Sequence, residues 1–443
     1  MNIIICGAGE VGSHAAEELG RAGHSIRIID RVPERLRALE EAMDVATLCG
    51  NCADAEVLAQ AGCSDTELVL AATDNDEINL LTASIAKGLG AKKTIARVHH
   101  SAFFEERGIN YRKHLDIDRL ICPEYLTALA IARKLRNPGA VAIESFARGR
   151  IEMQEFTAQS GSAVGKRLQD VQLPQGTRLA MIRRKDEAMI PEATTVVAPG
   201  DVIILVGNAG AFEDARKLFH QEKYTRKKIV LMGGPPMAVW LCRALHDRSF
   251  AIRLFEKDRE RALELADKLD WITVINADPT ERSIFEEEHI GQADVFIPLL
   301  DHDEANIIAG VMAKSRGVTE VFTILQRSKY VDLVYDIGVD EAFSPRIIGV
   351  EEINLVLDES PLRLLGTLVE GIVDVFRAKV SDRSSVIGKP LREIPFSPDW
   401  VVAAIQRDSD VHVPGADDTI ERGDTLLVIG RHSKQDTLKE LLL

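Results

Sequence analysis

The strongest constraint on the fold is an internal repeat, because the first half of the chain recurs in its second half. The segment IIICGA at residues 3–8 returns as IVLMGG at 229–234, which is 226 residues later. The segment DNDEIN at 74–79 returns as DHDEAN at 301–306, which is 227 residues later. Self-similarity at a nearly fixed offset predicts that the same structural unit is built twice.

Each repeat has a large part followed by a small part. In the small part, GKRL at residues 165–168 returns as GKPL at 388–391, and a Gly-Asp pair precedes a short apolar strand in both copies. The Asn-Pro-Gly sequence at 137–139 is a strong helix stop between the large and the small part of the first repeat. We therefore expect four domains, two large and two small, at residues 1–123, 140–224, 227–345 and 362–443.

Alternating strand and helix patterns predict the fold of the large part. Short apolar runs typical of buried strands alternate with longer segments that have helical periodicity. Strands and helices that alternate in this way favour a Rossmann-like, doubly wound parallel sheet. The fold class is therefore α/β, with this domain and a small α/β C-terminal module each present twice. The predicted strands cover 3–5, 26–29, 45–48, 67–72 and 94–98, and the predicted helices cover 10–21, 34–43, 56–61 and 76–89.

The first predicted strand runs directly into a glycine-rich turn. This turn fits the pattern G-x-G-x-x-G, which opens a helix in dinucleotide-binding domains. Gly7 allows the tight turn, Gly9 lets the backbone approach a pyrophosphate, and Gly12 lets the helix pack close to the strand. The N-terminal N–H groups of the helix then face the phosphates. The six residues of the turn are Gly7, Ala8, Gly9, Glu10, Val11 and Gly12.

Polar residues follow the other predicted strands, at the edge where such sheets bind ligands. Asp30 ends the second strand, where an acid accepts hydrogen bonds from an adenosine ribose. Arg97 offers a forked donor to a phosphate, although a solvated arginine at a strand end is the plain alternative. NAD(H), ATP and ADP all carry the ribose and phosphates that this site would bind, so the choice among them stays open. The other residues of the candidate site are Asn51, Thr73 and Asp74.

Charge and composition exclude several classes of function. The net charge of the 443-residue chain is −15, whereas a nucleic-acid binder needs a basic face, so we expect no nucleic-acid partner and no DNA-binding regulator. No apolar run approaches the roughly 20 residues that span a bilayer. The N-terminus has no basic segment followed by an apolar core, and we therefore expect a cytoplasmic protein. No metal site is expected, because Cys49, Cys52 and Cys63 lack a fourth ligand at a suitable spacing.

The sequence favours a binding protein over an enzyme. A dehydrogenase needs a substrate domain that holds an acid–base residue against the nicotinamide. His412 in the second small part has no counterpart in the first, and His99 and His100 fall in a loop after a strand. We therefore predict no catalytic residue, and an NAD-dependent dehydrogenase is the alternative hypothesis.

The second repeat departs from the nucleotide-binding pattern. Pro235 and Pro236 have no N–H to donate to a pyrophosphate. Ala238 replaces the close-packing glycine, and Ile324 stands where the first repeat has Arg97. We therefore expect a second nucleotide site that is weak, altered or empty. The site positions that the second repeat keeps are Gly233, Gly234, Glu256 and Asp301.

Taken together, these motifs resemble a known family, the regulatory proteins of Trk-type potassium uptake, which carry two tandem RCK (regulator of potassium conductance) units. The resemblance covers essentially the whole chain. It rests on the glycine-rich turn at 7–12, on TDNDEIN at 73–79 and on QRSKYVDLV at 326–334. It implies a regulatory subunit without enzymatic activity, in which nucleotide binding gates a membrane potassium-translocating subunit of the TrkH or TrkG type.

The resemblance also implies an assembly. Proteins of this family form a ring on the cytoplasmic side of the plasma membrane, where they are peripheral and held by their membrane partner. Predicted helices at 124–136 and 346–357 carry apolar faces that need a partner, which by the resemblance is another RCK unit. We expect a homo-oligomer, namely a tetramer with eight units in its ring.

Overall fold

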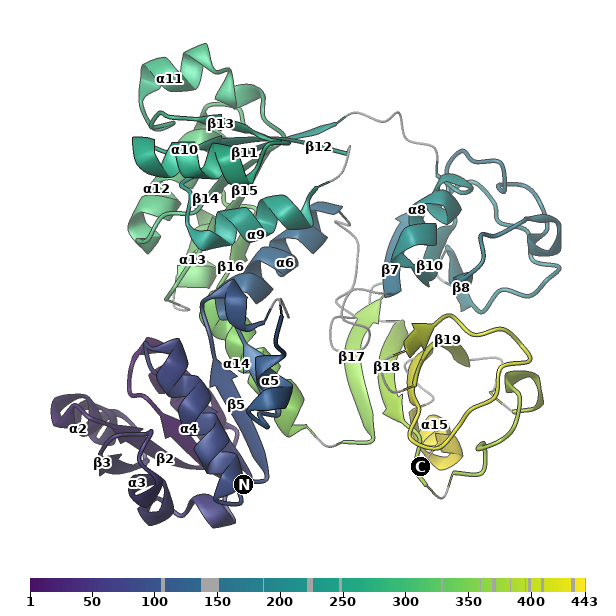
Figure 1. The fold of residues 1–443 in the computed structure, drawn as a ribbon. Helices are drawn as coiled ribbons and strands as arrows, with labels where there is room; N and C mark the ends of the chain where they lie inside the picture. The colour runs from purple at the N-terminus through teal and green to yellow at the C-terminus, as the bar shows by residue number, and fades with distance from the viewer. Residues whose placement is uncertain are drawn as a thin grey trace. The chain divides into compact units, whose positions relative to one another are not determined.

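The computed structural model of the chain forms two compact units, and each unit combines corresponding parts of the two repeats (Figure 1). The first unit comprises Met1–Ala132 and Thr225–Asp358, which hold the two large parts. The second unit comprises Arg133–Tyr224 and Glu359–Leu443, which hold the two small parts. The residues that the structure describes are 1–104, 108–136, 151–185, 187–220, 226–246, 249–327, 330–358, 360–368, 372–382, 384–394, 396, 400–407, 410–431 and 435–442.

The large part of the first repeat contains a six-stranded parallel sheet in the order β3-β2-β1-β4-β5-β6. The strand order changes direction between β1 and β4, and ligands bind at such a switch point in open α/β sheets. This confirms the predicted doubly wound fold and adds β6, which we did not predict. The strands are β1 (Asn2–Cys6), β2 (Ser25–Asp30), β3 (Ala46–Cys49), β4 (Leu68–Ala71), β5 (Lys93–Arg97) and β6 (Arg119–Ile121). The helices are α1 (Glu10–Arg21), α2 (Pro33–Ala42), α3 (Ala55–Gln60), α4 (Asp76–Gly88), α5 (Tyr111–His114) and α6 (Pro123–Arg136).

The large part of the second repeat has the same architecture. Its parallel sheet has the order β13-β12-β11-β14-β15-β16, which corresponds strand by strand to the first sheet. The predicted duplication is therefore confirmed. The strands are β11 (Lys227–Met232), β12 (Phe250–Phe255), β13 (Thr273–Ile275), β14 (Val295–Pro298), β15 (Glu320–Ile324) and β16 (Glu341–Phe343). The helices are α9 (Pro236–Ala244), α10 (Arg259–Lys268), α11 (Arg282–Glu287), α12 (Asp303–Ser315), α13 (Val331–Asp336) and α14 (Pro345–Leu357).

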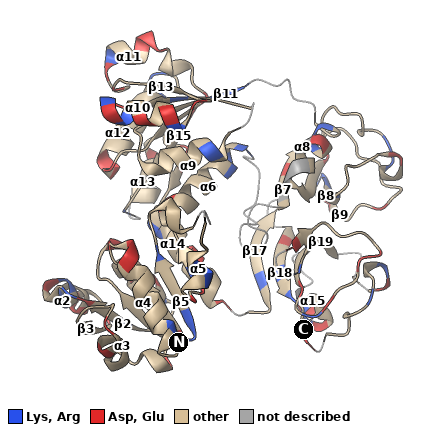
Figure 2. Cartoon of the chain, in the orientation of Figure 1, with Lys and Arg blue, Asp and Glu red and all other residues tan. Residues whose placement is uncertain are grey.

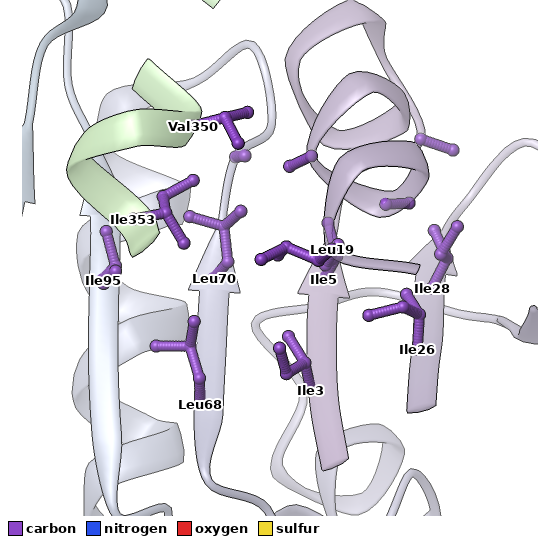
Figure 3. Packing of buried hydrophobic residues seen from close by; sticks show 14 of the residues in the cluster. Ile3, Ile5, Leu19, Ile26, Ile28, Leu68, Leu70, Ile95, Val350 and Ile353 are labelled. Atoms are coloured by element: carbon purple, nitrogen blue, oxygen red, sulfur yellow. The ribbon is translucent and has the colours of Figure 1, made fainter. Parts of the chain in front are cut away.

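The core over one face of the first sheet includes residues of the second repeat. β-Branched and leucine side chains of β1, β2, β4 and β5 cover this face, as expected for strands buried on both sides. Val350, Ile353 and Leu357 of α14 join this cluster and are at most 6% exposed. In Figure 3, Ile353 lies over Ile95 and Leu70 of the sheet. The first sheet therefore depends on a helix that follows it by more than 200 residues in the sequence.

The apolar helices that end the two large parts find partners in the opposite repeat of the same chain. While α14 packs on the first sheet, α6 lies beside α9 of the second repeat (Figure 1), and Tyr125 meets Trp240 edge-on at 5.8 Å. Helices α6 and α14 also approach each other, because a Cβ on Gly349 of α14 would lie 3.1 Å from the ring of Pro123 of α6. The predicted partner is thus another repeat, but within one chain rather than in a neighbouring copy.

The second unit contains two antiparallel sheets that share a core. Their orders are β7-β10-β8-β9 and β17-β18-β21-β19-β20. Buried residues of both sheets form one cluster, and Arg178 donates to the carbonyls of Val402 and Pro414. From the sequence we also expect strands over residues 144–156, of which the structure describes the part from Ile151 onward. The elements are β7 (Ile151–Thr157), β8 (Thr177–Arg184), β9 (Glu187–Met189), β10 (Val202–Asn208), α8 (Ala209–Lys217), β17 (Leu362–Leu368), β18 (Val373–Lys379), β19 (Trp400–Arg407), β20 (Asp410–His412), β21 (Thr425–Arg431) and α15 (Gln435–Leu442).

The Gly-Asp turns of the two small parts each place a buried aspartate against a partly exposed arginine. The carboxylate of Asp201 receives two hydrogen bonds from Arg184 and one from the backbone N–H of Ala198. Asp424 receives the same kind of fork from Arg407 in the second copy. These two acids, which the sequence indicated only as turn residues, therefore hold neighbouring loops together.

Within the described part of the chain, no helix has both the length and the apolar character needed to span a membrane.

Candidate nucleotide site

A cavity of about 400 Å³ opens at the carboxyl ends of the strands in the first repeat. It lies at the switch point between β1 and β4, where the fold places ligands. Figure 2 shows acidic residues at the start of α4, which begins at this edge. The structure brings together nine of the residues predicted from the sequence, since the lining includes Gly7, Gly9, Glu10, Val11, Asp30, Asn51, Thr73, Asp74 and Arg97.

Glycine stands at three positions of the turn for different structural reasons. Gly7 has φ of +111°, and a Cβ there would lie 2.8 Å from the carbonyl oxygen of Ala72. A Cβ on Gly12 would lie 1.9 Å from the carbonyl oxygen of Gly7, so the helix packs against the turn only because that position is glycine. Both residues are thus required by the fold itself.

Gly9 is different because nothing in the folded chain requires a glycine there. Its backbone is extended, with φ of −79° and ψ of −173°, a conformation that any residue adopts. No atom of the described chain beyond its neighbours lies within 4 Å of the place a Cβ would take. Gly9 caps the N-terminus of α1 and lines the cavity. The missing side chain therefore leaves free space directly in front of the helix N–H groups, where an anion binds.

Asp30 holds the glycine-rich turn in place. Its Oδ2 accepts the backbone N–H of Ala8 at 2.6 Å, and its Oδ1 accepts the N–H of Val32 at 2.8 Å. The residue is only 8% exposed. Ala8 itself does not line the cavity, and it contributes through this bond. A carboxylate oxygen accepts more than one hydrogen bond, so the role predicted for Asp30 toward a ribose is compatible with this geometry.

The motif at 73–79 fixes the edge of the cavity from behind. Asn79 accepts the N–H of Thr73 at 2.8 Å and donates to the carbonyl of Arg97 at 3.0 Å, so it ties the ends of β4 and β5 together. Asp76 accepts the backbone N–H groups of His99 and His100. Burial acts to raise the pKa of Asp76, but these hydrogen bonds and the ring of His99 outweigh burial and lower the pKa.

Arg97 lies at the cavity wall, where it pairs with an acid. Its Nη2 donates to Oε1 of Glu124 at 3.0 Å, and its side chain is 14% exposed. Its Nε is buried and has no hydrogen-bond partner among the described residues. A guanidinium at a cavity wall is the kind of group that a phosphate engages.

The sequence did not identify several residues that line the cavity. Three of them, Gln326, Pro345 and Arg346, come from the second repeat. One signal for Arg346 was present in the sequence, because it occupies the repeat position of Glu124 with opposite charge. The remaining lining residues are Arg31, Val32, Arg35, Cys52, Ala72, Ile78, Pro123 and Glu124.

The corresponding turn of the second repeat keeps the contact to its acid but has different side chains around it. Glu256 accepts the N–H of Gly234 at 2.8 Å, as Asp30 does for Ala8. However, Leu265 lies 2.3 Å from the place a Cβ on Gly234 would take, and Arg261 donates to the carbonyl of that glycine. The side chain of Leu300, which stands at the position of Thr73, lies 3.2 Å from a Cβ on Gly233. Asp301 is exposed after β14.

The described residues contain no cluster of three or more His, Cys, Asp or Glu side chains that is suited to hold a metal ion. The cavity itself combines a helix N-terminus, a glycine that leaves room, and a lining with both arginines and acids.

The fold and cavity define the chain as a protein with two Rossmann-like RCK-type large parts and two small antiparallel parts. The TrkA-N domain family matches residues 3–123 and 229–345, and the TrkA-C domain family matches residues 153–220 and 375–443. The chain therefore belongs to the TrkA family. A relative from Methanosarcina mazei, named Trk system potassium uptake protein TrkA homolog 2, is 30% identical over the full length of both chains.

Solved structures with the same fold include those of the GsuK channel and of the GsuK RCK domain. The structure of the GsuK channel bound to NAD superposes with a TM-score of 0.60 at 17% identity, covering all of this chain and 78% of that chain. The structure of GsuK bound to ADP superposes with a TM-score of 0.52 at 12% identity, covering 81% of this chain and 69% of that chain. At such identities these structures establish the RCK-type fold.

Proposed function

We propose that this chain is a nucleotide-binding regulatory subunit of a potassium uptake system. The observation that carries the proposal is Gly9, a glycine that neither the backbone nor the packing requires and that faces a cavity at a helix N-terminus. Its family membership and the names of its relatives supply the potassium transport system.

The ligand we propose is NAD(H), with ATP or ADP as nucleotides of the same site. The phosphates lie against Gly9 and the N–H groups that begin α1, the ribose is bound by Asp30, and Arg97 binds a phosphate. Two solved structures with this fold are those of GsuK bound to NAD and of GsuK bound to ADP, which supports this ligand class. Pro235 and Pro236 of the second repeat have no N–H to donate to a phosphate, and we infer that its site is weak, altered or empty.

The chain acts by gating rather than by catalysis. A ligand shifts a conformational equilibrium only when it binds one state more tightly than the other. Moving a ring from about 1% to about 99% of its active state needs roughly 5.5 kcal/mol of such preference, which several identical sites share. We place the protein in a homotetramer on the cytoplasmic face of the plasma membrane, bound to a TrkH- or TrkG-type potassium-translocating subunit.

Calorimetric titration of the purified full-length chain with NAD⁺, NADH, ATP, ADP and AMP tests the proposal. We expect saturable binding of adenine nucleotides, without turnover of NADH when it is incubated with candidate hydroxy- or keto-acid substrates. If no adenine nucleotide binds at millimolar concentration, the proposed regulatory site is wrong. Substrate-dependent oxidation of NADH would instead favour the dehydrogenase.

A further inference from the structure

The cavity of the first repeat is completed by the second repeat. Pro345 and Arg346, at the start of α14, line it together with Gly9 and Glu10. The helix is placed there by packing, since its buried face lies on the first sheet through Val350, Ile353 and Leu357 (Figure 3). The cavity lining therefore exists in full only when the two large parts are docked.

Arg346 reaches the entrance of α1, where phosphates bind. Its Nη2 donates to Oε2 of Glu10, the first residue of that helix. The pKa of His14 on the same helix is lowered first by burial and also by the charge of Arg346. The side chain of Arg346 is 16% exposed, whereas that of Glu10 is 77% exposed. The arginine is thus held in the cavity, while its present partner is mostly in solvent.

The repeat comparison shows that this arginine is a specific change. In the first repeat, Glu124 follows Pro123 at the start of α6 and pairs with Arg97. At the equivalent positions of the second repeat, Arg346 follows Pro345 and the buried Ile324 replaces Arg97. The second repeat has lost the cation of its own site and gained one that faces the first site.

The pairing of Arg346 with Glu10 is suited to exchange for a phosphate on ligand binding. The cavity lining holds four arginines and four acids, so its formal charges cancel before a ligand enters. The Glu10–Arg346 pair is weak because Glu10 is 77% exposed, so that water competes for its carboxylate. A terminal phosphate carries more charge than a carboxylate and offers three acceptor oxygens to the guanidinium fork. The four arginines are Arg31, Arg35, Arg97 and Arg346, and the four acids are Glu10, Asp30, Asp74 and Glu124.

We propose that Arg346 of the second repeat binds the free terminal phosphate of a nucleoside di- or triphosphate that is held by the first repeat. The proposal rests on the proposed nucleotide site. Arg346 distinguishes such ligands from NAD, whose two phosphates are both internal, and from AMP, whose single phosphate stays at Gly9. This contact joins the ligand to both α1 and α14. Helix α14 ends at Leu357, and the chain enters the second unit at Glu359. Binding of the terminal phosphate therefore reinforces the docking of the two repeats.

The test is a calorimetric comparison of full-length variants with four ligands: ATP, ADP, AMP and NAD⁺. In Arg346→Ala, the dissociation constants of ATP and ADP rise about tenfold or more, as expected for the loss of a charge-assisted contact. Those of AMP and NAD⁺ stay within about twofold of the unmodified chain. Arg346→Lys keeps the charge without the fork and gives an intermediate loss for ATP.

The matched control is Arg282→Ala, which removes an exposed arginine of the second repeat that pairs with Glu286 outside the cavity. This control leaves all four constants unchanged. Thermal unfolding without ligand confirms that Arg346→Ala is folded. If Arg346→Ala weakens the binding of all four ligands equally, or does not weaken the binding of ATP and ADP, the role of Arg346 is overturned while nucleotide binding itself stands. Failure of the unmodified chain to bind any of the four ligands overturns the proposed function instead.

Discussion

Asp30 and Ala8 are joined by a hydrogen bond of 2.6 Å, in which the backbone N–H of the glycine-rich turn donates to the acid that ends β2. The second repeat keeps the bond between Glu256 and Gly234 at 2.8 Å, although Pro235 and Pro236 follow in its turn. The acid therefore serves the fold of the turn in both repeats. Keeping it does not by itself preserve a nucleotide site.

The asymmetry between the two turns gives a binding prediction. Gly9→Asp adds bulk and negative charge where the phosphates lie, so nucleotide binding falls below detection, while folding is preserved because no chain atom is near. Pro235→Asp, the equivalent change, leaves binding nearly unchanged. The measurement is the calorimetric stoichiometry of both variants. Equal loss of stoichiometry in the two variants would show that the second repeat binds nucleotide as well as the first.

Asp30 also gives a prediction about cofactor choice. A carboxylate at the ribose position repels the 2′-phosphate of NADP, so NADP(H) binds at least about tenfold more weakly than NAD(H). Arg31 and Arg35 line the same cavity and soften this preference, so replacing both with alanine increases the ratio. Competition titration against NADH measures the ratio of the two dissociation constants. Similar affinities for the two cofactors would remove Asp30 from the ribose site.

Asp76 gives a prediction about acid stability. Its pKa is lowered in the folded chain, so its stabilising contribution is present above the unfolded value of about 3.9 and is lost as the pH falls through the folded value. Asp76→Asn therefore destabilises the first large part at neutral pH, by about 1–3 kcal/mol, and flattens its loss of stability below about pH 4. Glu77→Gln, an exposed neighbour, is the control. Urea unfolding between about pH 2.5 and 7 measures both, and identical pH profiles for Asp76→Asn and the unmodified chain would contradict this role.

Much of the fold could be predicted because its signals are local. Apolar runs such as Ile3 to Ile5, followed by glycine and a helix, indicate a parallel strand and its binding edge without tertiary information. The strand β6 was missed because Arg119–Ile121 has only three residues and follows a polar segment. Arg346 was missed as a site residue because its place depends on the packing of α14 on a distant sheet, which no local pattern encodes.

Two equivalent exposed residues give a prediction about assembly. Leu81 of α4 and Ile308 of α12 occupy the same position in the two repeats and are 51% and 68% exposed. Because α6 and α14 are already paired within the chain, these residues are our candidates for contacts between chains. Leu81→Asp with Ile308→Asp shifts the homo-oligomer toward monomer in light scattering at micromolar concentration. Leu263→Asp, an equally exposed position without an apolar counterpart, keeps the oligomer. A chain that is monomeric before any change would contradict the predicted tetramer.

The most direct test of the regulatory account is rubidium uptake by cells that lack other potassium uptake systems and express this chain together with its membrane partner. The account predicts that Gly9→Asp, which is folded but binds no nucleotide, abolishes the uptake that depends on this chain, while Pro235→Asp supports uptake at the unmodified level. Unmodified uptake with a folded Gly9→Asp chain that has lost nucleotide binding would contradict the claim that the first site gates transport.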